Sequence, residues 1–488
     1  MKSIHIIGGG LAGPEAALQA AALGCKVVLS EMRPLRSTEA HQTSDFAELV
    51  CSNSLKSESE NTAPWLLKQE MRRAGSFLLR AADAAAVPAG HALAVDRAVF
   101  SARVAELIAA EPNIEVRREE VTTLDEHDPN TITILASGPL TSAPLAAELQ
   151  RLTGAAHLAF YDSISPIVDA STIDMDKVYF AARWDKGTAD YINCPFTKAQ
   201  YETFLDALTN AEKIEAKSWE QIPTPDSVIL SGAQSAESKD PEGDYVTTAV
   251  GPISTSNAAP LQYFEGCLPI EETARRGRDT LRFGPMKPAG LTNPRTGRWP
   301  YAAVQLRQEN LRADSYNLVG FQNSLKFGEQ ARVLRLIPGL EHATFLRYGQ
   351  IHRNTYIHAP SLLTETLQLR AHPSILIAGQ LSGVEGYTES IAGGLLAGRF
   401  AAALARGEQP TPAPRLTANG SLLHYITHAD AKKFQPANIT FDLLPPLEDD
   451  LRKQIRDKKE RHRIQCERAL AAWDVWLAET SADLTAMR

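Results

Sequence analysis

Three glycines near the start of the chain have the spacing of a nucleotide-binding turn. They are Gly8, Gly10 and Gly13 in the stretch HIIGGGLAGPEAA, which gives the pattern G-x-G-x-x-G. In such a turn the first glycine permits a tight bend, the second lets the backbone approach a pyrophosphate, and the third lets the helix pack on the strand. The pyrophosphate then lies at the helix N-terminus, where free N–H groups favour negative charge. The residues expected at the cofactor are Gly8, Gly9, Gly10, Leu11, Ala12 and Gly13.

The segments around this turn have the order that a dinucleotide site requires. SIHIIG is a short apolar strand, GLAGPEAALQAAALG is an alanine-rich helix, and KVVLSE is a second buried strand that ends at Glu31. An acidic residue about 20 residues after the turn typically accepts hydrogen bonds from ribose hydroxyls. The alternative is a glycine-rich turn without a ligand, and the combination of strand, helix and acid disfavours it.

Two later segments favour FAD over NAD. TITILASGPL resembles the strand and small-residue turn by which two-dinucleotide flavoproteins return to the nucleotide, and it places Gly138 there. ILIAGQLSGVEGYTESIAGG resembles their late strand, which places Gly379, Gln380 and Gly386 near the flavin and starts a helix whose N-terminus would stabilise charge on reduction. Close packing of a core helix is the alternative for these glycines. Only one G-x-G-x-x-G follows a strand, so a separate NAD(P)H domain is not expected.

The five cysteines need individual explanations. They are widely scattered, odd in number and without a CxxC pair, which disfavours a disulfide framework and a zinc site, and no metal is expected. Cys25 and Cys466 are expected in the core, and Cys194 is more consistent with a structural role than a functional one. Cys51 differs, because it opens the polar stretch CSNSLKSESE although cysteine is usually buried. Cys267 lies beside Gly266 in FEGCLPIE, where backbone can approach a ligand.

The elements that position these residues indicate an α/β fold: a Rossmann-like FAD-binding domain of the two-dinucleotide flavoprotein type, interrupted by a mixed α+β insertion domain. The expected parts are 1–160 and 336–440 for the FAD-binding domain, 161–335 for the insertion or substrate domain, and 441–488 for a C-terminal amphipathic helix. An extended polar loop is expected over 213–262. Further helices are expected over 67–86 and 98–111.

Composition bounds the class of protein. The chain has 488 residues, 44% hydrophobic and 22% charged, and a net charge of −8. No uninterrupted apolar run of about 18 residues occurs, so no membrane span is expected. The N-terminus lacks signal-peptide architecture, so a cytoplasmic protein is expected. A nucleic-acid partner would require a local basic patch.

Several long strings together match one known family. They include FAELVCSNSLKSE, PAGHALAVDR, FEGCLPIE, RFGPMKP, AVQLRQEN, VGFQNSLKFGEQ, RYGQIHRNTYI and HYITHADAKKFQPANITFDLLP. The chain closely resembles the folate- and FAD-dependent tRNA (uracil-5-)-methyltransferases over nearly its whole length. It departs from the family pattern in the long polar stretch before FEGC.

The resemblance implies a defined reaction. FAD, reduced by NADPH or NADH, would take a one-carbon unit from 5,10-methylenetetrahydrofolate and pass it to C5 of the T-loop uridine at tRNA position 54, giving ribothymidine. C5 of uracil is a poor nucleophile until a thiolate adds at C6, and a base must then remove the C5 proton. In family terms Cys267 resembles the nucleophile and Cys51 the assisting thiol, with the reverse assignment open.

Basic residues in the same motif strings are weaker candidates for the folate and uracil site, with structural ion pairs as the alternative: Arg282, Lys287, Arg307, His352 and Arg353. Two basic segments could contact tRNA phosphates. One spans 275–298 with Trp299 and Tyr301 adjacent for base stacking, and the other spans 452–463, where a solvated helix face is the alternative. The target base would have to turn outward from its loop.

Two other functions remain open at this point. One is a related flavin oxidoreductase that acts on another tRNA uridine, and the other is a non-catalytic, flavin-bearing RNA-binding protein. Oligomeric state and the preference between NADH and NADPH are also open.

Overall fold

The computed structural model describes residues 1–38, 40–154, 158–185, 188–214 and 268–485, and most of the expected polar loop, from residue 215 on, lies outside these residues. Residue contacts divide the chain into two compact units. Unit 1 consists of Met1–Leu158, Glu309–Leu311 and Thr355–Arg488, and unit 2 consists of Ala159–Gln308 and Arg312–Asn354. Residues 336–354, which the sequence analysis assigned to the FAD-binding domain, fall in unit 2.

Unit 1 is built on a five-stranded sheet in which every neighbouring pair is parallel. In spatial order the strands are β16 (Ile375–Ile377), β7 (Thr131–Leu135), β1 (Ser3–Ile7), β2 (Val27–Glu31) and β6 (Ile114–Arg118). The central strands carry buried branched residues such as Ile4, Ile6 and Leu29, as expected for a parallel sheet covered on both faces. The expected α/β class of Rossmann type is confirmed.

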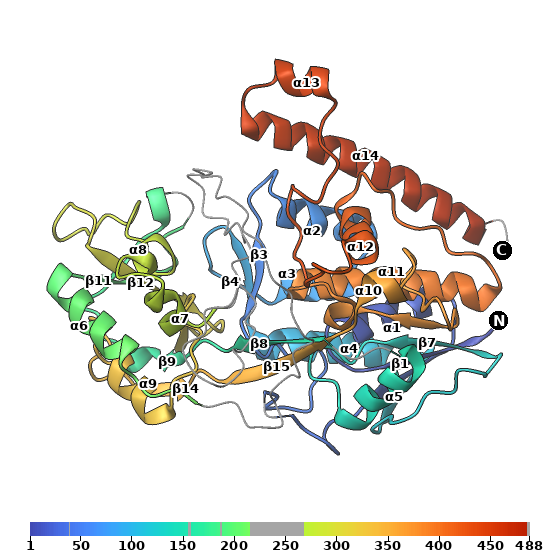
Figure 1. The fold of residues 1–488 in the computed structure, drawn as a ribbon, viewed down its shortest axis with the longest axis horizontal. Coiled ribbons are helices and arrows are strands. Elements are labelled where there is room, and N and C mark those ends of the chain that lie inside the picture. The colour runs from blue at the N-terminus through green and yellow to red at the C-terminus, as the bar shows by residue number, and fades with distance from the viewer. Residues whose placement is uncertain (39, 155–157, 186–187, 215–267, 486–488) are drawn as a thin grey trace. The chain divides into compact units, whose positions relative to one another are not determined.

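Two helices lie side by side in unit 1, α1 (Ala12–Ala22) and α11 (Tyr387–Arg406) (Figure 1). Glycines permit their close approach. A Cβ on Gly394 would lie 2.3 Å from the Ala12 carbonyl oxygen, and one on Gly398 would lie 2.5 Å from that of Ala16. Close helix packing, the alternative considered for this glycine-rich segment, therefore explains the glycines within α11.

The helical structure expected over 67–86 is confirmed, and it is divided between two helices, α2 (Ala63–Arg73) and α3 (Phe77–Ala84). Gly75, with φ +77°, turns the chain between them. The Ser76 hydroxyl then accepts from Leu79 N at 3.3 Å, and the buried Glu15 carboxylate accepts from Leu78 N at 2.8 Å. These caps satisfy free N–H groups of a new helix N-terminus.

The remaining elements of unit 1 surround the sheet. The helix expected over 98–111 is confirmed as α4 (Arg97–Ala110). A small antiparallel sheet consists, in spatial order, of β3 (Ser54–Ser57), β5 (Ala92–Val95) and β4 (Ala86–Val87). Three further helices are α5 (Ala143–Thr153), α10 (Ala359–Leu362) and α12 (Ala418–His428).

The C-terminal segment is helical but not continuous. It forms α13 (Asp449–Gln454) and α14 (Lys458–Thr485), separated at Ile455, whose ψ of 103° is not helical. Trp473 of α14 is fully buried and donates from Nε1 to the Glu70 carbonyl at 2.6 Å. This anchors one face of the helix to α2. Among the described residues, no helix is long and apolar enough to cross a membrane.

Unit 2 is a mixed α+β structure around an antiparallel sheet. Its strands, in spatial order, are β10 (Tyr179–Phe180), β11 (Ile192–Phe196), β12 (Ala302–Gln308), β13 (Ser315–Leu318), β9 (Ile167–Asp169) and β14 (Phe345–Arg347). The α-helices in the described part of this unit are α6 (Lys198–Thr209), α7 (Ile270–Arg275), α8 (Thr280–Phe283) and α9 (Phe327–Leu334). A separate two-stranded sheet pairs β8 (Leu158–Ser163) with β15 (Ile351–Tyr356). Buried aromatics such as Phe196, Phe204 and Phe321 fill the core of the unit.

Candidate functional site

Four of the expected cofactor residues lie at the ends of neighbouring strands. Gly8 follows β1, Glu31 ends β2, Gly138 follows β7 and Gly379 follows β16. Because these strands are parallel and adjacent, their carboxyl ends meet at one edge of the sheet. Ligands of open α/β sheets bind at this edge, and the structure therefore assembles the expected site from segments far apart in the sequence.

The glycine turn has the shape of a phosphate cradle. Gly8 has φ +115°, and a Cβ there would lie 2.5 Å from the Ala136 carbonyl oxygen. A Cβ on Gly13 would lie 1.8 Å from the Gly8 carbonyl oxygen, so α1 can start here only with glycine. A Cβ on Gly10, by contrast, would meet no atom within 4 Å. Two glycines serve packing, and the third faces open space, as the close approach of a pyrophosphate requires.

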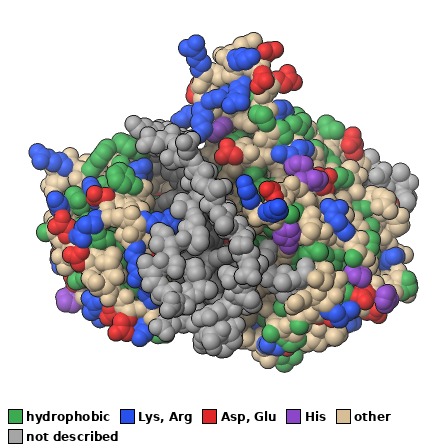
Figure 2. Space-filling view, viewed as in Figure 1, with side chains coloured by type: hydrophobic (Ala, Val, Ile, Leu, Met, Phe, Trp, Pro, Cys, Tyr) green, Lys and Arg blue, Asp and Glu red, His purple; other side chains and the backbone are tan. Residues whose placement is uncertain are grey.

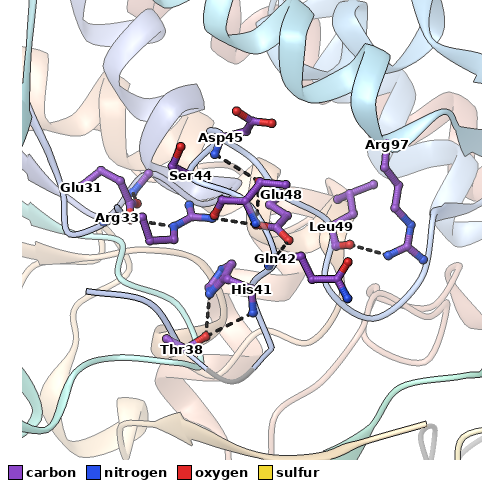
Figure 3. A network of polar contacts seen from close by, with 12 residues as sticks. Glu31, Arg33, Thr38, His41, Gln42, Ser44, Asp45, Glu48, Leu49 and Arg97 are labelled. Carbon is purple, nitrogen blue, oxygen red and sulfur yellow. Dashed lines mark hydrogen bonds and ion pairs between the residues drawn. The ribbon is translucent and has the colours of Figure 1, made fainter. Parts of the chain in front are cut away.

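Glu31 is held against the glycine turn by a buried network of charges (Figure 3). Its Oε2 accepts from Gly9 N at 2.6 Å, and its Oε1 accepts from Arg33 N and Nε at 2.9 and 2.8 Å. Arg33 also pairs with Glu48 at 3.0 Å. Burial alone would raise the pKa of the Glu31 carboxyl, but hydrogen bonds and charge from Arg33 hold the pKa below its ordinary value. Glu31 thus stays ionised, and its remaining lone pairs can accept from a ligand.

The N-terminus of α11 carries a second buried carboxylate. Glu389 is fully buried, and its Oε1 accepts from Lys56 Nζ at 2.7 Å and from Ile439 N at 3.1 Å. Its Oε2 has no hydrogen-bond partner among the described residues. Gly386, with φ +112°, starts the helix, and a Cβ on it would lie 2.3 Å from that oxygen. The structure therefore leaves one buried carboxylate oxygen without a donor from the described residues beside the start of α11.

Three other residues expected at the flavin, Gly379, Gln380 and Gly138, are held in place by close contacts, hydrogen bonds or left-handed backbone angles. Gly379 has φ +69°, and a Cβ on it would lie 2.8 Å from the Ala12 Cβ. Gln380 donates from Nε2 to Glu385 Oε2 at 2.5 Å. At the end of β7, Gly138 has φ +68°, and its carbonyl accepts from the Thr141 hydroxyl at 2.8 Å. The left-handed φ at Gly379 and Gly138 explains why glycine occupies both strand ends.

Cys51 lies beside the first residue of α11. Its backbone N–H donates to the Tyr387 hydroxyl at 2.7 Å, and Ser52 N donates to the same oxygen at 3.2 Å. Burial, together with the neighbouring Cys51 thiol, raises the pKa of Tyr387. Cys51 itself is half-buried. The tyrosine therefore fixes the backbone of this loop against the helix that follows the flavoprotein-like strand.

A half-buried cation, Arg97, lies within electrostatic range of Cys51. Arg97 donates from Nη1 to the Leu49 carbonyl at 2.6 Å, which Figure 3 shows, and from Nε to Glu309 Oε2 at 2.8 Å. Burial would lower the pKa of the Arg97 guanidinium, but interactions with Glu309, Tyr387 and Cys51 together more than offset it and raise the pKa. A fixed positive charge near a thiol favours the thiolate, which is the reactive form.

The remaining described cysteines are structural. Cys25, Cys194 and Cys466 are all buried, and burial raises the pKa of each thiol, to about 12 for Cys466. The expectation that Cys25 and Cys466 belong to the core is confirmed, and the burial of Cys194 agrees with the structural role favoured for it. Cys267 lies outside the described residues, so its relation to Cys51 stays a prediction.

The basic candidates of unit 2 have mixed environments. Arg282 pairs with Asp279 at 2.8 Å and stacks 3.7 Å above the Tyr301 ring, as the structural alternative predicts. Arg307 is buried and Lys287 is half-buried. The side chains of His352 and Arg353 lie outside the described residues.

The two basic segments considered for tRNA are partly neutralised. In unit 2 Arg278 pairs with Asp206 at 2.8 Å, and in the C-terminal segment Arg463 pairs with Glu460 at 2.6 Å. Figure 2 shows acidic side chains beside the basic ones over α13. Unit 2 also exposes two indoles in edge contact, Trp184 and Trp299, whose ring centroids are 5.1 Å apart. Trp184, which has a φ of +60°, was not among the residues expected at a tRNA-binding surface.

Comparisons with known proteins identify the family. Residues 3–236 and 243–409 match the family described as glucose inhibited division protein A. The protein of Koribacter versatilis named methylenetetrahydrofolate--tRNA-(uracil-5-)-methyltransferase TrmFO is 62% identical over 475 residues, 97% of this chain and 98% of that one. Proteins of the same name from Symbiobacterium thermophilum and Enterococcus faecalis are 52% and 48% identical, over 97% and 96% of this chain and 96% and 97% of theirs.

The chain belongs to the TrmFO family. The resemblance found in its sequence motifs is thereby confirmed. A solved structure of Aquifex aeolicus GidA shares the fold, with a TM-score of 0.64 and 15% identity over 100% of this chain and 76% of that one.

Three residues around Cys51 were not expected from the sequence: Tyr387, Arg97 and Glu309. Arg97 and Glu309 do lie in the motif strings PAGHALAVDR and AVQLRQEN that this TrmFO chain carries.

Proposed function

We propose that this chain methylates C5 of the T-loop uridine at position 54 of tRNA. The carbon donor is 5,10-methylenetetrahydrofolate, the cofactor is FAD, and NADPH or NADH supplies the electrons. The observation that carries the proposal is near-full-length identity of 48% to 62% with relatives named for this methyl transfer. The chain also has a half-buried cysteine, Cys51, whose backbone N–H donates to the first residue of α11. The shape of the glycine turn, with Gly10 facing open space, fits a dinucleotide.

Residues of unit 1 would hold FAD at the carboxyl edge of the parallel sheet. The turn of residues 8–13 would receive the pyrophosphate at the N-terminus of α1, and Glu31 would accept from the ribose. The N-terminus of α11, with its dipole and the unpartnered Glu389 oxygen, would face the polar edge of the flavin. When bound, FAD supplies the relay by which electrons and the one-carbon unit reach the uracil.

The chain's own thiols would act on the uracil. The Cys267 thiolate would add to C6, and the electron pair of the C5–C6 double bond would move onto C5 and its carbonyl as an enolate. C5 would then bond to the one-carbon unit, and a base would take the C5 proton as the bond between that carbon and its carrier nitrogen breaks, which leaves an exocyclic methylene. Hydride added to this methylene would give the methyl group, re-form the C5–C6 double bond and expel the thiolate. Cys51 would be the assisting thiol, kept ionisable by Arg97.

The redox balance requires a reductant. A methylene group lies at the oxidation level of formaldehyde, so its conversion to a methyl group consumes two electrons and a proton. NAD(P)H gives these electrons by hydride transfer, and the overall products are ribothymidine, tetrahydrofolate and NAD(P)⁺. The reaction therefore predicts one NAD(P)H oxidised for each methyl group transferred.

An exposed surface of unit 2 would contribute to tRNA binding. Trp184 and Trp299 are each about half exposed, and unstacked bases bind well to such rings. Arg298 is exposed and Lys287 half-buried in the same segment as Trp299. Together these residues would offer stacking and phosphate contacts.

The test is a transfer assay with labelled 5,10-methylenetetrahydrofolate, NADPH and an unmodified tRNA transcript. We expect label in the wild-type transcript and none in a transcript whose position 54 is not uridine. Label that appears regardless of that uridine would contradict the proposed target. NADPH oxidation without any transfer would instead favour the flavin oxidoreductase acting on another uridine.

A further inference from the structure

We propose that Glu365, His424 and His428 form a binding site for one divalent transition-metal ion of the Zn²⁺ class. The three side chains lie in unit 1, and one donor atom from each falls within 4.8 Å of the others. None of these residues belongs to the glycine turn, the α11 N-terminus or the Cys51 environment. The site is thus separate from the one proposed for methyl transfer.

The two histidines form a pair on one face of α12. They are four residues apart, and their rings stack with centroids 4.3 Å apart and planes 14° apart. The Nδ1 atoms of both rings face the same carboxylate oxygen. Glu365 Oε1 lies 3.3 Å from His424 Nδ1 and 3.6 Å from His428 Nδ1.

These separations match those of a tetrahedral metal site. With metal–ligand bonds of about 2.0–2.2 Å, two ligands of a tetrahedron lie roughly 3.4 Å apart. Both nitrogen–oxygen distances are close to that value. The two rings are stacked with their planes only 14° apart, so each must rotate to aim its Nδ1 lone pair at one shared ion. Two imidazoles and one carboxylate suit zinc and neighbouring transition metals better than Mg²⁺ or Ca²⁺, which prefer oxygen ligands.

Both elements that carry the donors are rigid. Glu365 lies in a turn closed by Thr364 N donating to the Gln368 carbonyl at 3.0 Å and by a bridge between Leu363 and Leu369. The N-terminus of α12 is capped by the buried Glu70, which accepts from Ala418 N at 2.6 Å. A site on elements already held in place loses little conformational entropy when it binds an ion.

The surroundings set limits on the affinity. The side chains of Glu365, His424 and His428 are 43%, 39% and 48% exposed, so an ion can reach them from solvent and water can complete the coordination. The Arg415 guanidinium, which donates to the Ser421 hydroxyl at 2.6 Å, interacts electrostatically with Glu365 and opposes a cation there. The Thr427 hydroxyl lies 3.0 Å from His428 Nδ1 and must give up this contact.

No metal was expected from the sequence because the cysteines lack the spacing of a zinc site. The pattern H-x-x-x-H in HYITH places two imidazoles on one face of a helix, which is a recognisable half-site. The third donor lies 59 residues before His424, and only the fold brings it close.

The test is Zn²⁺ binding by the flavin-loaded, untagged chain, measured by calorimetry, with Co²⁺ absorption as a probe of tetrahedral coordination. The variants are His424→Asn, His428→Asn and Glu365→Gln. His127→Asn is the matched control, because His127 also lies 3.6 Å from one glutamate, Glu126, but belongs to no cluster of three possible metal donors among the described residues.

We expect one Zn²⁺ per chain and a visible Co²⁺ band in the wild type and in His127→Asn. Each of the three site variants should weaken this binding at least about tenfold, since even the loss of an outer-shell partner costs 10- to 100-fold. Equal Zn²⁺ affinity in the wild type and all three site variants, or no saturable binding, would overturn the proposal. Methyl transfer should be unaffected by His428→Asn, so failure of the metal site would leave the proposed function intact.

Discussion

Two substitutions in the glycine turn separate cofactor binding from packing. A Cβ on Gly10 meets no atom within 4 Å, whereas a Cβ on Gly13 would lie 1.8 Å from the Gly8 carbonyl oxygen. Gly10→Ala should therefore change the unfolding free energy of the flavin-free protein by no more than about 0.5 kcal/mol, as is usual for a substitution without contacts. Gly13→Ala should destabilise it by about 1–3 kcal/mol or more, because α1 must move away from the strand end.

Flavin affinity should respond differently. The open space at Gly10 is where the pyrophosphate is expected to approach the backbone, so the methyl group of Gly10→Ala would occupy ligand space. We expect its FAD dissociation constant to rise at least tenfold, which corresponds to about 1.4 kcal/mol. Titration of flavin-free protein by the quenching of flavin fluorescence measures the affinity, and denaturant unfolding measures the stability.

The reasoning would be refuted if Gly10→Ala bound FAD as tightly as the wild type. In that case the turn would not contact the cofactor. Gly24→Ala is a suitable control, because a Cβ there also meets no atom within 4 Å, so any strain from its φ of +83° should affect stability but not flavin affinity.

Three further predictions concern charge and stacking. Burial raises the pKa of the Glu70 carboxyl from 4.5 to about 7, so its contribution to stability is full below about pH 4.5 and is lost as pH rises through about 7. Over that pH range the unfolding free energy of Glu70→Gln, measured by denaturant unfolding, should increase by on the order of 3 kcal/mol relative to that of the wild type. Arg97→Gln should slow iodoacetamide labelling of Cys51 up to about tenfold, measured by peptide mass spectrometry, whereas Arg97→Lys, which keeps the charge, should retain much of the labelling rate. Equal labelling rates in the wild type and both variants would exclude a role for the charge. Trp299→Ala should weaken tRNA binding at least about fivefold in a filter-binding assay, whereas Phe327→Ala, also about half exposed, should not; equal effects would argue against stacking.

The parts of the site that the sequence could predict are those coded by short local patterns. Gly8, Gly13 and Glu31 belong to one strand-turn-helix-strand unit, and their positions at neighbouring strand ends follow from the spacing alone. Gly138 and Gly379 could be located because each follows a short apolar strand. The resemblance to the family then supplied roles for the cysteines that no periodicity could provide.

The parts that the sequence could not predict depend on contacts between distant segments. Arg97 and Glu309 pair across 212 residues, and Tyr387 reaches Cys51 across 336. The division of the 67–86 segment into two helices depends on Glu15, a buried carboxylate 63 residues before Leu78 that caps the second helix. Such partners have no local signature, because only the folded chain brings them together.

The most direct test of the proposed chemistry compares three cysteine variants in the same methyl-transfer assay. Cys51→Ser and Cys267→Ser holoenzymes should keep their visible flavin absorbance but transfer no labelled methyl group to tRNA. Cys25→Ala, which changes a buried thiol of the core, should transfer at a rate close to that of the wild type. Wild-type rates of transfer by either serine variant would contradict the claim that this chain uses both thiols.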